Sequence, residues 1–169
     1  VDCIEHGGSM TDETIQLLLD KKLPIVTTFA PLVMQSQAEI ARQYNIPEWK
    51  IAERQKAVAD GGRFVGLVKA ARAGIPIAFG TDAGSPAVGH EVVAPELKFM
   101  VQAGIKRDNY DALRCATIVA AHVSNLQDTL GTLEAGKAAD VIVIAGDPLA
   151  DLDALEHVEM TFVAGKRLV

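Results

Sequence analysis

The chain has 169 residues, of which 49% are hydrophobic and 22% are charged, and its formal net charge is -6. These values are typical of a globular domain with a sizeable core, and they argue against a nucleic-acid partner, which would favour a basic surface. No apolar run approaches the roughly 20 residues that a membrane span requires, so we also expect no membrane partner.

The two cysteines give an expectation about the compartment. Cys3 and Cys115 lie far apart in the sequence and do not form a metal-binding spacing. Both have apolar neighbours, which predicts buried thiols in a reducing environment. No signal-peptide pattern precedes the first apolar segment. We therefore expect a cytoplasmic protein.

Apolar segments and amphipathic segments alternate along the first half of the chain. β-Branched and other apolar residues predict strands, and apolar residues at helical spacing predict helices. Thr11 is placed to cap the first helix. The predicted strands cover residues 1–6, 23–30 and 75–84, and the predicted helices cover residues 9–22, 36–44, 47–60, 63–74, 95–103 and 109–124. Continuous apolar strands separated by helices predict an α/β fold with a parallel sheet.

The pattern changes in the last 40 residues. Residues 140–147 and 158–169 are predicted strands, and the second contains a hairpin around Ala164-Gly165-Lys166. The intervening residues are turn-like. We therefore predict a domain boundary near Thr129, with residues 1–129 forming one unit and residues 130–169 a second.

Side chains of metal-ligand type follow two of the predicted parallel strands. His6 ends the first strand, and Asp82 follows the apolar part of the third. The carboxyl ends of parallel strands meet at one edge of a sheet, where active sites of α/β proteins form. Imidazole and carboxylate are zinc ligands, and an aspartate beside a metal-bound water can also accept its proton. The alternative is that His6 is a hydrogen-bonded structural residue and Asp82 a turn residue, because two ligands do not complete a zinc site.

Several segments, in order, resemble a known family. They are "VDCIEHG", "IPIAFGTDAG", "APELKFMVQAGI", "DALRCATIVAAHVSNLQDTLGTLEAGKAADVIVIAGDPLADL" and "VEMTFVAGKRLV". Together they resemble the C-terminal half of a metal-dependent amidohydrolase, in the branch of imidazolonepropionases and prolidase-like enzymes. The resemblance implies strands six to eight of a (β/α)8 TIM barrel, followed by part of a small β-sandwich. It also implies one or two divalent metal ions, usually zinc, and hydrolysis of an amide-type C–N bond in a small-molecule or dipeptide-like substrate, or a cyclic amide.

The resemblance assigns roles to three residues. His6 matches the histidine that ends strand six, which binds metal in two-metal members and contacts substrate in one-metal members. Asp82 matches the aspartate that ends strand eight, which is a metal ligand and the catalytic proton acceptor. His90 matches a histidine in the following loop, where it contacts substrate or supports a ligand, although a solvent-facing loop residue is an equal alternative.

The chain departs from the family pattern in its missing ligands. The family needs an HxH pair, a lysine or its equivalent after strand four and a further histidine after strand five, whereas the other histidines here are His122 and His157, which we expect to be structural. We therefore expect a fragment whose partner is a second copy of itself or a missing N-terminal half. The alternative function is a catalytically inert module with a structural or interaction role. A nucleotide-binding domain is disfavoured because neither GxGxxG nor GxxxxGK[ST] occurs.

Overall fold

Three short parallel strands form the centre of residues 1–129 in the computed structural model, which describes residues 1–61 and 64–169. They are β1 (Ile4–His6), β2 (Ile25–Thr27) and β3 (Ile77–Phe79), in the order β1-β2-β3. The register places Ile25 beside both Ile4 and Ile77, so one apolar row crosses the sheet. The α/β fold with a parallel sheet, predicted from the alternation of segments, is confirmed.

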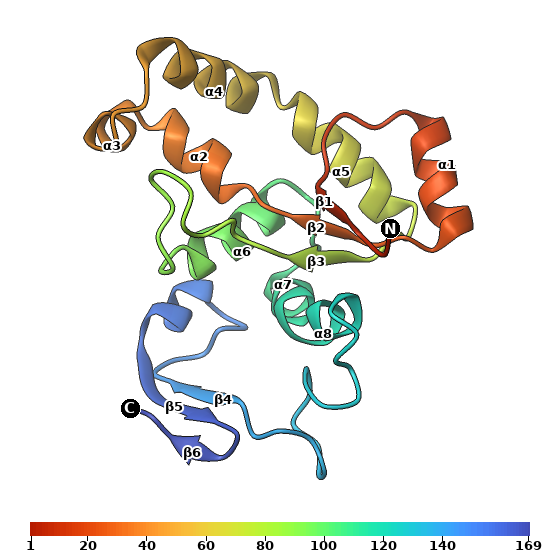
Figure 1. The fold of residues 1–169 in the computed structure, drawn as a ribbon, viewed down its shortest axis with the longest axis vertical. Coiled ribbons are helices and arrows are strands. Elements are labelled where there is room, and N and C mark those ends of the chain that lie inside the picture. The colour runs from red at the N-terminus through yellow and green to blue at the C-terminus, as the bar shows by residue number, and fades with distance from the viewer.

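Helices connect the strands and cover the sheet (Figure 1). The helices before β3 are α1 (Asp12–Lys21), α2 (Ala30–Ser36), α3 (Ala38–Gln43), α4 (Glu48–Asp60) and α5 (Gly62–Arg72). Those after β3 are α6 (Val93–Gln102), α7 (Asn109–Arg114), the π-helical turn η1 (Cys115–Val119) and α8 (Ala120–Val123). Arg63, the first residue of the helix predicted over 63–74, lies outside the described residues.

Local sequence accounts for the limits of α1. The side chain of Thr11 accepts a hydrogen bond from the backbone N–H of Thr14 at 3.2 Å, which confirms its predicted role as the N-cap. Lys22 ends the helix in the left-handed conformation, with φ of 54°. The apolar stripe between these caps places Ile15 and Leu18 in the core.

The segment after β2 differs from the prediction. Residues 23–30 were predicted as one strand, but β2 stops at Thr27 and α2 begins at Ala30. The physical reason is a contact from far along the chain. The carboxylate of Glu96 in α6 accepts hydrogen bonds from the backbone N–H groups of Phe29 and Ala30, which a helix start otherwise leaves unsatisfied.

The main core lies between the sheet and its helices. Phe29, Phe64 and Phe99 pack in a cluster, with ring centroids 5.0–5.1 Å apart. Ile25, Leu67 and other apolar residues from α1, α5 and α6 surround them. Because these helices pack on the strands, the core holds the strand ends in place.

A second sheet is antiparallel and lies beyond α7 and α8 (Figure 1). Its strands are β4 (Val141–Ile144), β5 (Val158–Val163) and β6 (Lys166–Arg167), and the short 3-10 helix η2 (Leu152–Glu156) lies between β4 and β5. The predicted hairpin is present, and its turn residues Ala164 and Gly165 both have positive φ.

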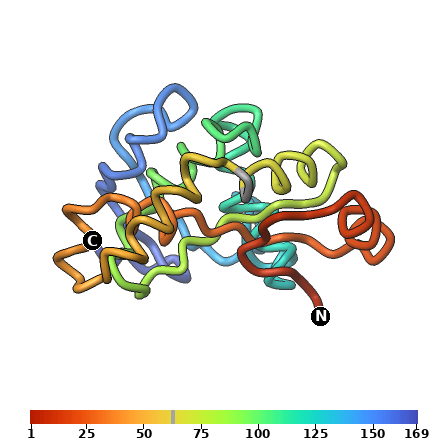
Figure 2. The backbone as a smooth tube through the Cα atoms, turned by 90° about the horizontal axis from the view of Figure 1, so that it is seen from above, coloured from red at the N-terminus to blue at the C-terminus, as the bar shows by residue number. Residues whose placement is uncertain are grey.

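The two sheets are linked by packing. Leu152 of η2 belongs to the main core, and Asp153 forms an ion pair with Lys98 of α6. The two chain termini lie on opposite sides of the molecule (Figure 2). The boundary near Thr129, with units at 1–129 and 130–169, stays a prediction.

The cysteines have different environments. Cys115 is fully buried, as predicted, and burial raises the pKa of its thiol to about 11. Cys3 was also predicted to be buried, and this is wrong. It is half-buried near the start of the chain, where its thiol contacts the exposed carboxylate of Glu5.

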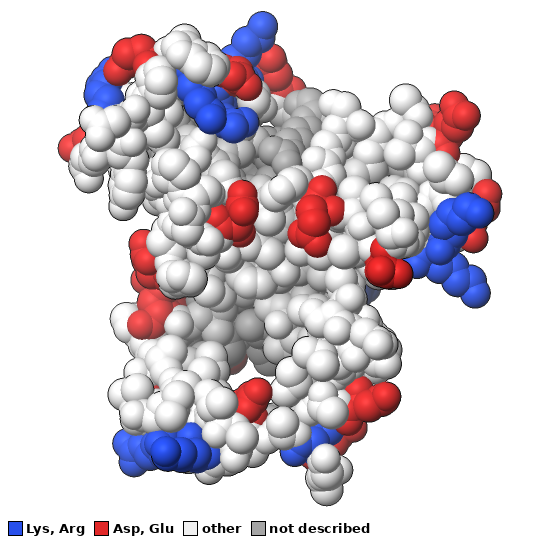
Figure 3. All heavy atoms as spheres, in the orientation of Figure 1, with Lys and Arg blue, Asp and Glu red and all other residues white. Residues whose placement is uncertain are grey.

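Surface charge and helix length bear on possible partners. Lys and Arg side chains lie toward the rim of the face in Figure 3, whereas Asp and Glu side chains also lie near its centre. Among the residues that the structure describes, no helix has both the length and the apolar composition to cross a membrane.

Candidate active site at the strand ends

His6 is the last residue of β1 and is exposed. Its backbone has φ of 66°, a left-handed conformation that is uncommon outside glycine. The ring atom Nδ1 lies 2.6 Å from Oγ1 of Thr28, the residue that follows β2. The other ring nitrogen, Nε2, has no hydrogen-bond partner among the described residues, so it is the ring atom left available for a ligand.

The end of β3 approaches the end of β2 closely because Gly80 has no side chain. A β carbon at Gly80 would lie 2.8 Å from Cγ1 of Val26, 3.1 Å from the carbonyl oxygen of Thr27 and 3.2 Å from Cγ2 of Thr28. Only glycine allows this approach without displacing a neighbour. Thr28 therefore contacts His6 through its hydroxyl group and lies against the start of the loop that carries Asp82.

Asp82 begins a tight loop after β3. Its φ is 56°, and its carbonyl oxygen accepts a hydrogen bond from the hydroxyl of Ser85 at 2.9 Å. The hydroxyl of Thr81 accepts a bond from the backbone N–H of Ala83 at 3.2 Å. Within residues 1–61 and 64–169 the exposed carboxylate of Asp82 has no hydrogen-bond or ion-pair partner. The loop thus holds the backbone and leaves the carboxylate available.

His90 lies in the same loop and is exposed. The loop is anchored from α2, where Nε2 of Gln35 donates a hydrogen bond to the carbonyl oxygen of Pro86 at 2.9 Å, and by the buried side chains of Ala87 and Val88. In the part of the chain that the structure describes, no hydrogen bond or ion pair joins His90 to His6 or Asp82. Its role in substrate contact therefore stays a prediction.

The sheet brings His6 and Asp82 to the same edge but on different strands. The register matches His6 to Thr27 and Thr27 to Phe79, so two strand spacings, or about 10 Å, separate β1 from β3 at this level. Across residues 1–61 and 64–169, no group of three or more His, Cys, Asp and Glu side chains is arranged to hold a metal ion. His6 and Asp82 fit zinc by donor type and exposure, but they supply only part of the usual set of three protein ligands.

The other histidines lie elsewhere. His122 is exposed on α8, and His157 is exposed between η2 and β5. Neither follows one of the three parallel strands, and their structural role stays a prediction.

Sequence reasoning missed Glu96. This residue is only 2% exposed. Its Oε1 and Oε2 atoms lie 2.8 and 3.0 Å from the backbone nitrogen of Phe29, and Oε2 also lies 2.6 Å from that of Ala30. A single acid at a buried position of an amphipathic helix was the available signal, because a buried carboxylate requires hydrogen-bond partners. Its partners could not be identified without the tertiary structure, since they lie more than 60 residues away.

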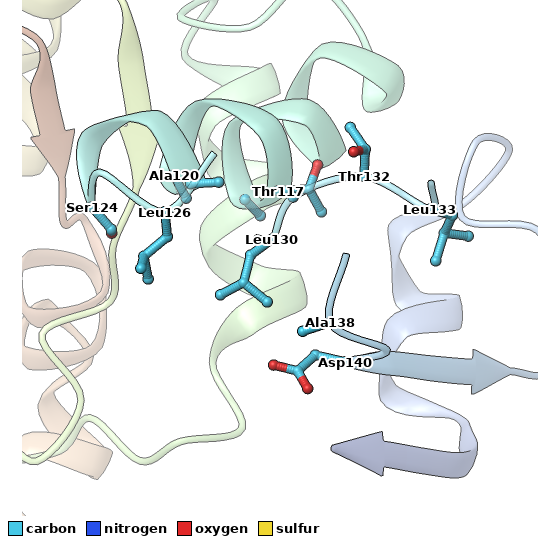
Figure 4. Close-up of a pocket in the computed structure, with 12 residues that line it drawn as sticks. Thr117, Ala120, Ser124, Leu126, Leu130, Thr132, Leu133, Ala138 and Asp140 are labelled. Atoms are coloured by element: carbon cyan, nitrogen blue, oxygen red, sulfur yellow. The ribbon is translucent and has the colours of Figure 1, made fainter. Parts of the chain in front are cut away.

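A cavity of about 400 Å³ lies in another part of the molecule (Figure 4). Its lining comes from η1, α8 and the segment that leads to β4, and most of it is apolar or small. The labelled side chains include Leu126, Leu130 and Asp140. His6, Asp82 and His90 do not line it, so the cavity is separate from the strand-end site.

The fold and the strand-end residues define a class: an α/β protein with ligand-type side chains at the carboxyl edge of a parallel sheet. Comparison of the sequence with family models is more specific. The model described as the amidohydrolase family matches residues 5–168, so the chain belongs to that family.

Individual relatives and solved structures are similar to nearly the whole of this chain. An uncharacterized protein of Mycobacterium tuberculosis (strain ATCC 25618 / H37Rv), Rv2915c, is 32% identical over 98% of this chain and 42% of its own. The structure of a Xaa-Pro dipeptidase with methionine bound in its active site is 32% identical, with a TM-score of 0.77 over 99% of this chain and 40% of that one. A prolidase in complex with N-methylphosphonate-L-proline is 26% identical, with a TM-score of 0.78 and the same coverage. The chain thus spans about two fifths of the length of these relatives.

Proposed function

We propose that this chain carries part of the active site of a metal-dependent amidohydrolase, in which β1, β2 and β3 are strands six to eight of a (β/α)8 barrel. The observation that carries the proposal is the placement of His6 and Asp82, both exposed, at the carboxyl ends of two strands of one parallel sheet. The antiparallel strands β4–β6 correspond to part of a small β-sandwich.

In this proposal His6 and Asp82 are metal ligands, and zinc is the metal that their donor types favour. A bound zinc ion would supply a Lewis acid that lowers the pKa of a water molecule toward neutrality. The carboxylate of Asp82 accepts the proton of the attacking water and returns it to the leaving amine. Its lack of an ion pair among the described residues suits this role, since a Lys or Arg partner would occupy the oxygen atoms that the metal ion and the water molecule require.

The substrate class follows from the relatives. Two of them are described as a Xaa-Pro dipeptidase and a prolidase, which supports an amide-type C–N bond in a small dipeptide-like molecule. His90 lies eight positions after Asp82 in the loop at the same edge, and we assign it to substrate contact. The remaining ligands would come from residues outside this chain, supplied by an N-terminal half or a partner subunit.

Zinc content tests the proposal directly. The purified chain is dialysed against Zn²⁺, freed of excess ion and measured by elemental analysis, beside the variants Asp82→Ala, His6→Ala and, as a matched control, His122→Ala. We expect bound zinc in the parent chain and in His122→Ala, and loss of zinc in the other two. Equal zinc content in all four proteins would contradict the assignment of the ligands.

A second function is an inert structural or interaction module. It is favoured by one observation, namely that the described residues offer no group of three metal-ligand side chains. This alternative predicts no bound zinc and no hydrolysis of Xaa-Pro dipeptides by the chain, with or without added metal.

A further inference from the structure

We infer that Glu96 and Thr28 are positioning residues for His6: Glu96 holds the backbone after β2, and Thr28 holds Nδ1 of the imidazole, so that Nε2 is the atom that meets a ligand. This inference rests on the proposed function for the identity of that ligand. The positions of the residues themselves come from contacts within the chain.

The first step is the contact between Glu96 and the backbone. Its carboxylate accepts hydrogen bonds from the N–H groups of Phe29 and Ala30, and all three residues are buried. Hydrogen bonds from backbone N–H groups to a carboxylate are short, so they fix the position of the donors relative to the acceptor. It therefore determines where β2 ends and α2 begins, and with that the position of Thr28.

The second step is the contact between Thr28 and His6. Thr28 is 6% exposed, so its hydroxyl group has little access to water, and Oγ1 lies 2.6 Å from Nδ1 of His6. His6 itself is exposed, and exposed imidazole rings otherwise rotate freely between rotamers. The bond to a buried partner removes this freedom.

The third step is the choice of ring nitrogen. A neutral imidazole has one N–H donor and one nitrogen with a free lone pair. When Nδ1–H donates to Oγ1 of Thr28, Nε2 carries the lone pair, which is the form that a metal ion requires. The hydrogen-bond partner of a ligating histidine typically changes metal affinity by about 10- to 100-fold.

The test uses the metal-free chain labelled with ¹⁵N, in which the ring nitrogens of His6 are identified by their loss in His6→Ala. We expect the shifts of the Nδ1–H form in the parent chain and in Thr28→Ser, which keeps the hydroxyl group. Thr28→Val, which is nearly isosteric but lacks the hydroxyl group, is expected to lose that preference. An unchanged His6 spectrum in Thr28→Val would overturn the inference.

Glu96→Gln tests the role of Glu96, with Glu91→Gln, an exposed residue of the loop just before α6, as its control. Because an amide has only one acceptor oxygen, we expect Glu96→Gln to reduce the preference of His6 for the Nδ1–H form, and Glu91→Gln to leave it unchanged. Should Glu96→Gln fail to fold, amide hydrogen exchange in the parent chain decides the point. Slow exchange at Phe29 and Ala30 supports the Glu96 bonds, and rapid exchange contradicts them.

Titration with Zn²⁺ adds a second measurement on the same proteins. We expect Thr28→Val to bind Zn²⁺ about tenfold more weakly than the parent chain and Thr28→Ser to restore the affinity. Absence of Zn²⁺ binding in the parent chain would count against the proposed function, whereas the NMR spectra of the metal-free chain would still decide whether Thr28 and Glu96 position His6. Equal affinities in the parent chain and Thr28→Val would count against the positioning role.

Discussion

His6 and Asp82 share a backbone conformation that few residues adopt: φ is 66° at His6 and 56° at Asp82. His6 is the last residue of β1, Asp82 lies three residues after the end of β3, and both are the residues to which ligand roles are assigned. The left-handed conformation costs an L-residue with a β carbon about 1–2 kcal/mol, although histidine and aspartate tolerate it better than most. Strain of this kind clusters at functional sites.

This conformation predicts an unusual ranking of substitutions at Asp82. We expect Asp82→Gly to be more stable than Asp82→Ala by about 1 kcal/mol, because glycine adopts positive φ without steric cost. Gln16, exposed in the middle of α1, is the matched control, and there alanine should exceed glycine by about 1 kcal/mol. Urea unfolding measures both pairs, and the prediction fails if alanine is also the more stable residue at position 82.

Gly66 predicts a steric cost inside a helix. A β carbon there would lie 2.4 Å from the carbonyl oxygen of Gly8 and 2.8 Å from the backbone nitrogen of Met10. Alanine gains about 1 kcal/mol in helix propensity, but two backbone contacts cannot relax as a flexible side chain can, so the clash dominates. We expect Gly66→Ala to lower the free energy of unfolding by about 2 kcal/mol.

The control for this effect is Gly8→Ala. No heavy atom lies within 4 Å of a β carbon built at Gly8. Its unfolding free energy should change by less than about 0.5 kcal/mol. Similar losses of unfolding free energy in Gly66→Ala and Gly8→Ala would contradict the steric explanation, because they would show that any substitution near the loop after β1 lowers stability.

Gly80 predicts a local effect on the site. Gly80→Ala would push the end of β3 away from Val26 and Thr27, because its β carbon would lie 2.8 Å from Cγ1 of Val26. We expect a loss of about 1–3 kcal/mol in stability and a changed ¹⁵N spectrum for His6, since Thr28 lies in the same contact. Gly8→Ala again provides the control. An unchanged His6 spectrum in Gly80→Ala would show that the close approach of β3 to β2 does not determine the position of His6.

Cys115 predicts a pH dependence of stability. Burial raises the pKa of its thiol to about 11, whereas the pKa in an unfolded chain is about 8.5. Above pH 8.5 the unfolded state ionises while the folded state keeps its proton, so this contribution to stability is complete below about pH 8.5 and is lost as the pH rises toward 11.

Unfolding of the parent chain and Cys115→Ala at several pH values measures this contribution. Between pH 7.5 and pH 10 we expect the parent chain to lose about 2 kcal/mol more of its unfolding free energy than Cys115→Ala loses. Cys115→Val, which also lacks the thiol, should show the same pH profile as Cys115→Ala. Parallel curves for the parent chain and both variants would contradict the prediction.

Features that depend on neighbouring residues were predicted from the sequence, whereas features that depend on contacts between distant residues were not. Thr11 was correctly predicted as a helix cap because its partner, Thr14, lies three residues away. The start of α2 was not predicted, because the carboxylate that satisfies its first N–H groups comes from Glu96. Cys3 was predicted to be buried from its apolar neighbours, but the first strand lies at the edge of the sheet, where one side of the strand has no covering neighbour among the described residues.

By itself, the sequence determined the alternation of parallel strands with helices, although not α2, the hairpin at Ala164 and Gly165, and the resemblance to amidohydrolases that the match over residues 5–168 confirmed. These features depend on periodicity, turn chemistry and motifs, which are properties of neighbouring residues. The tertiary structure alone decided that Thr28 would hold His6 and that Glu96 would hold the backbone beside Thr28. Those contacts join residues 22 and 67 positions apart, and only the packing of α6 and the strands against a common core brings them within hydrogen-bond distance.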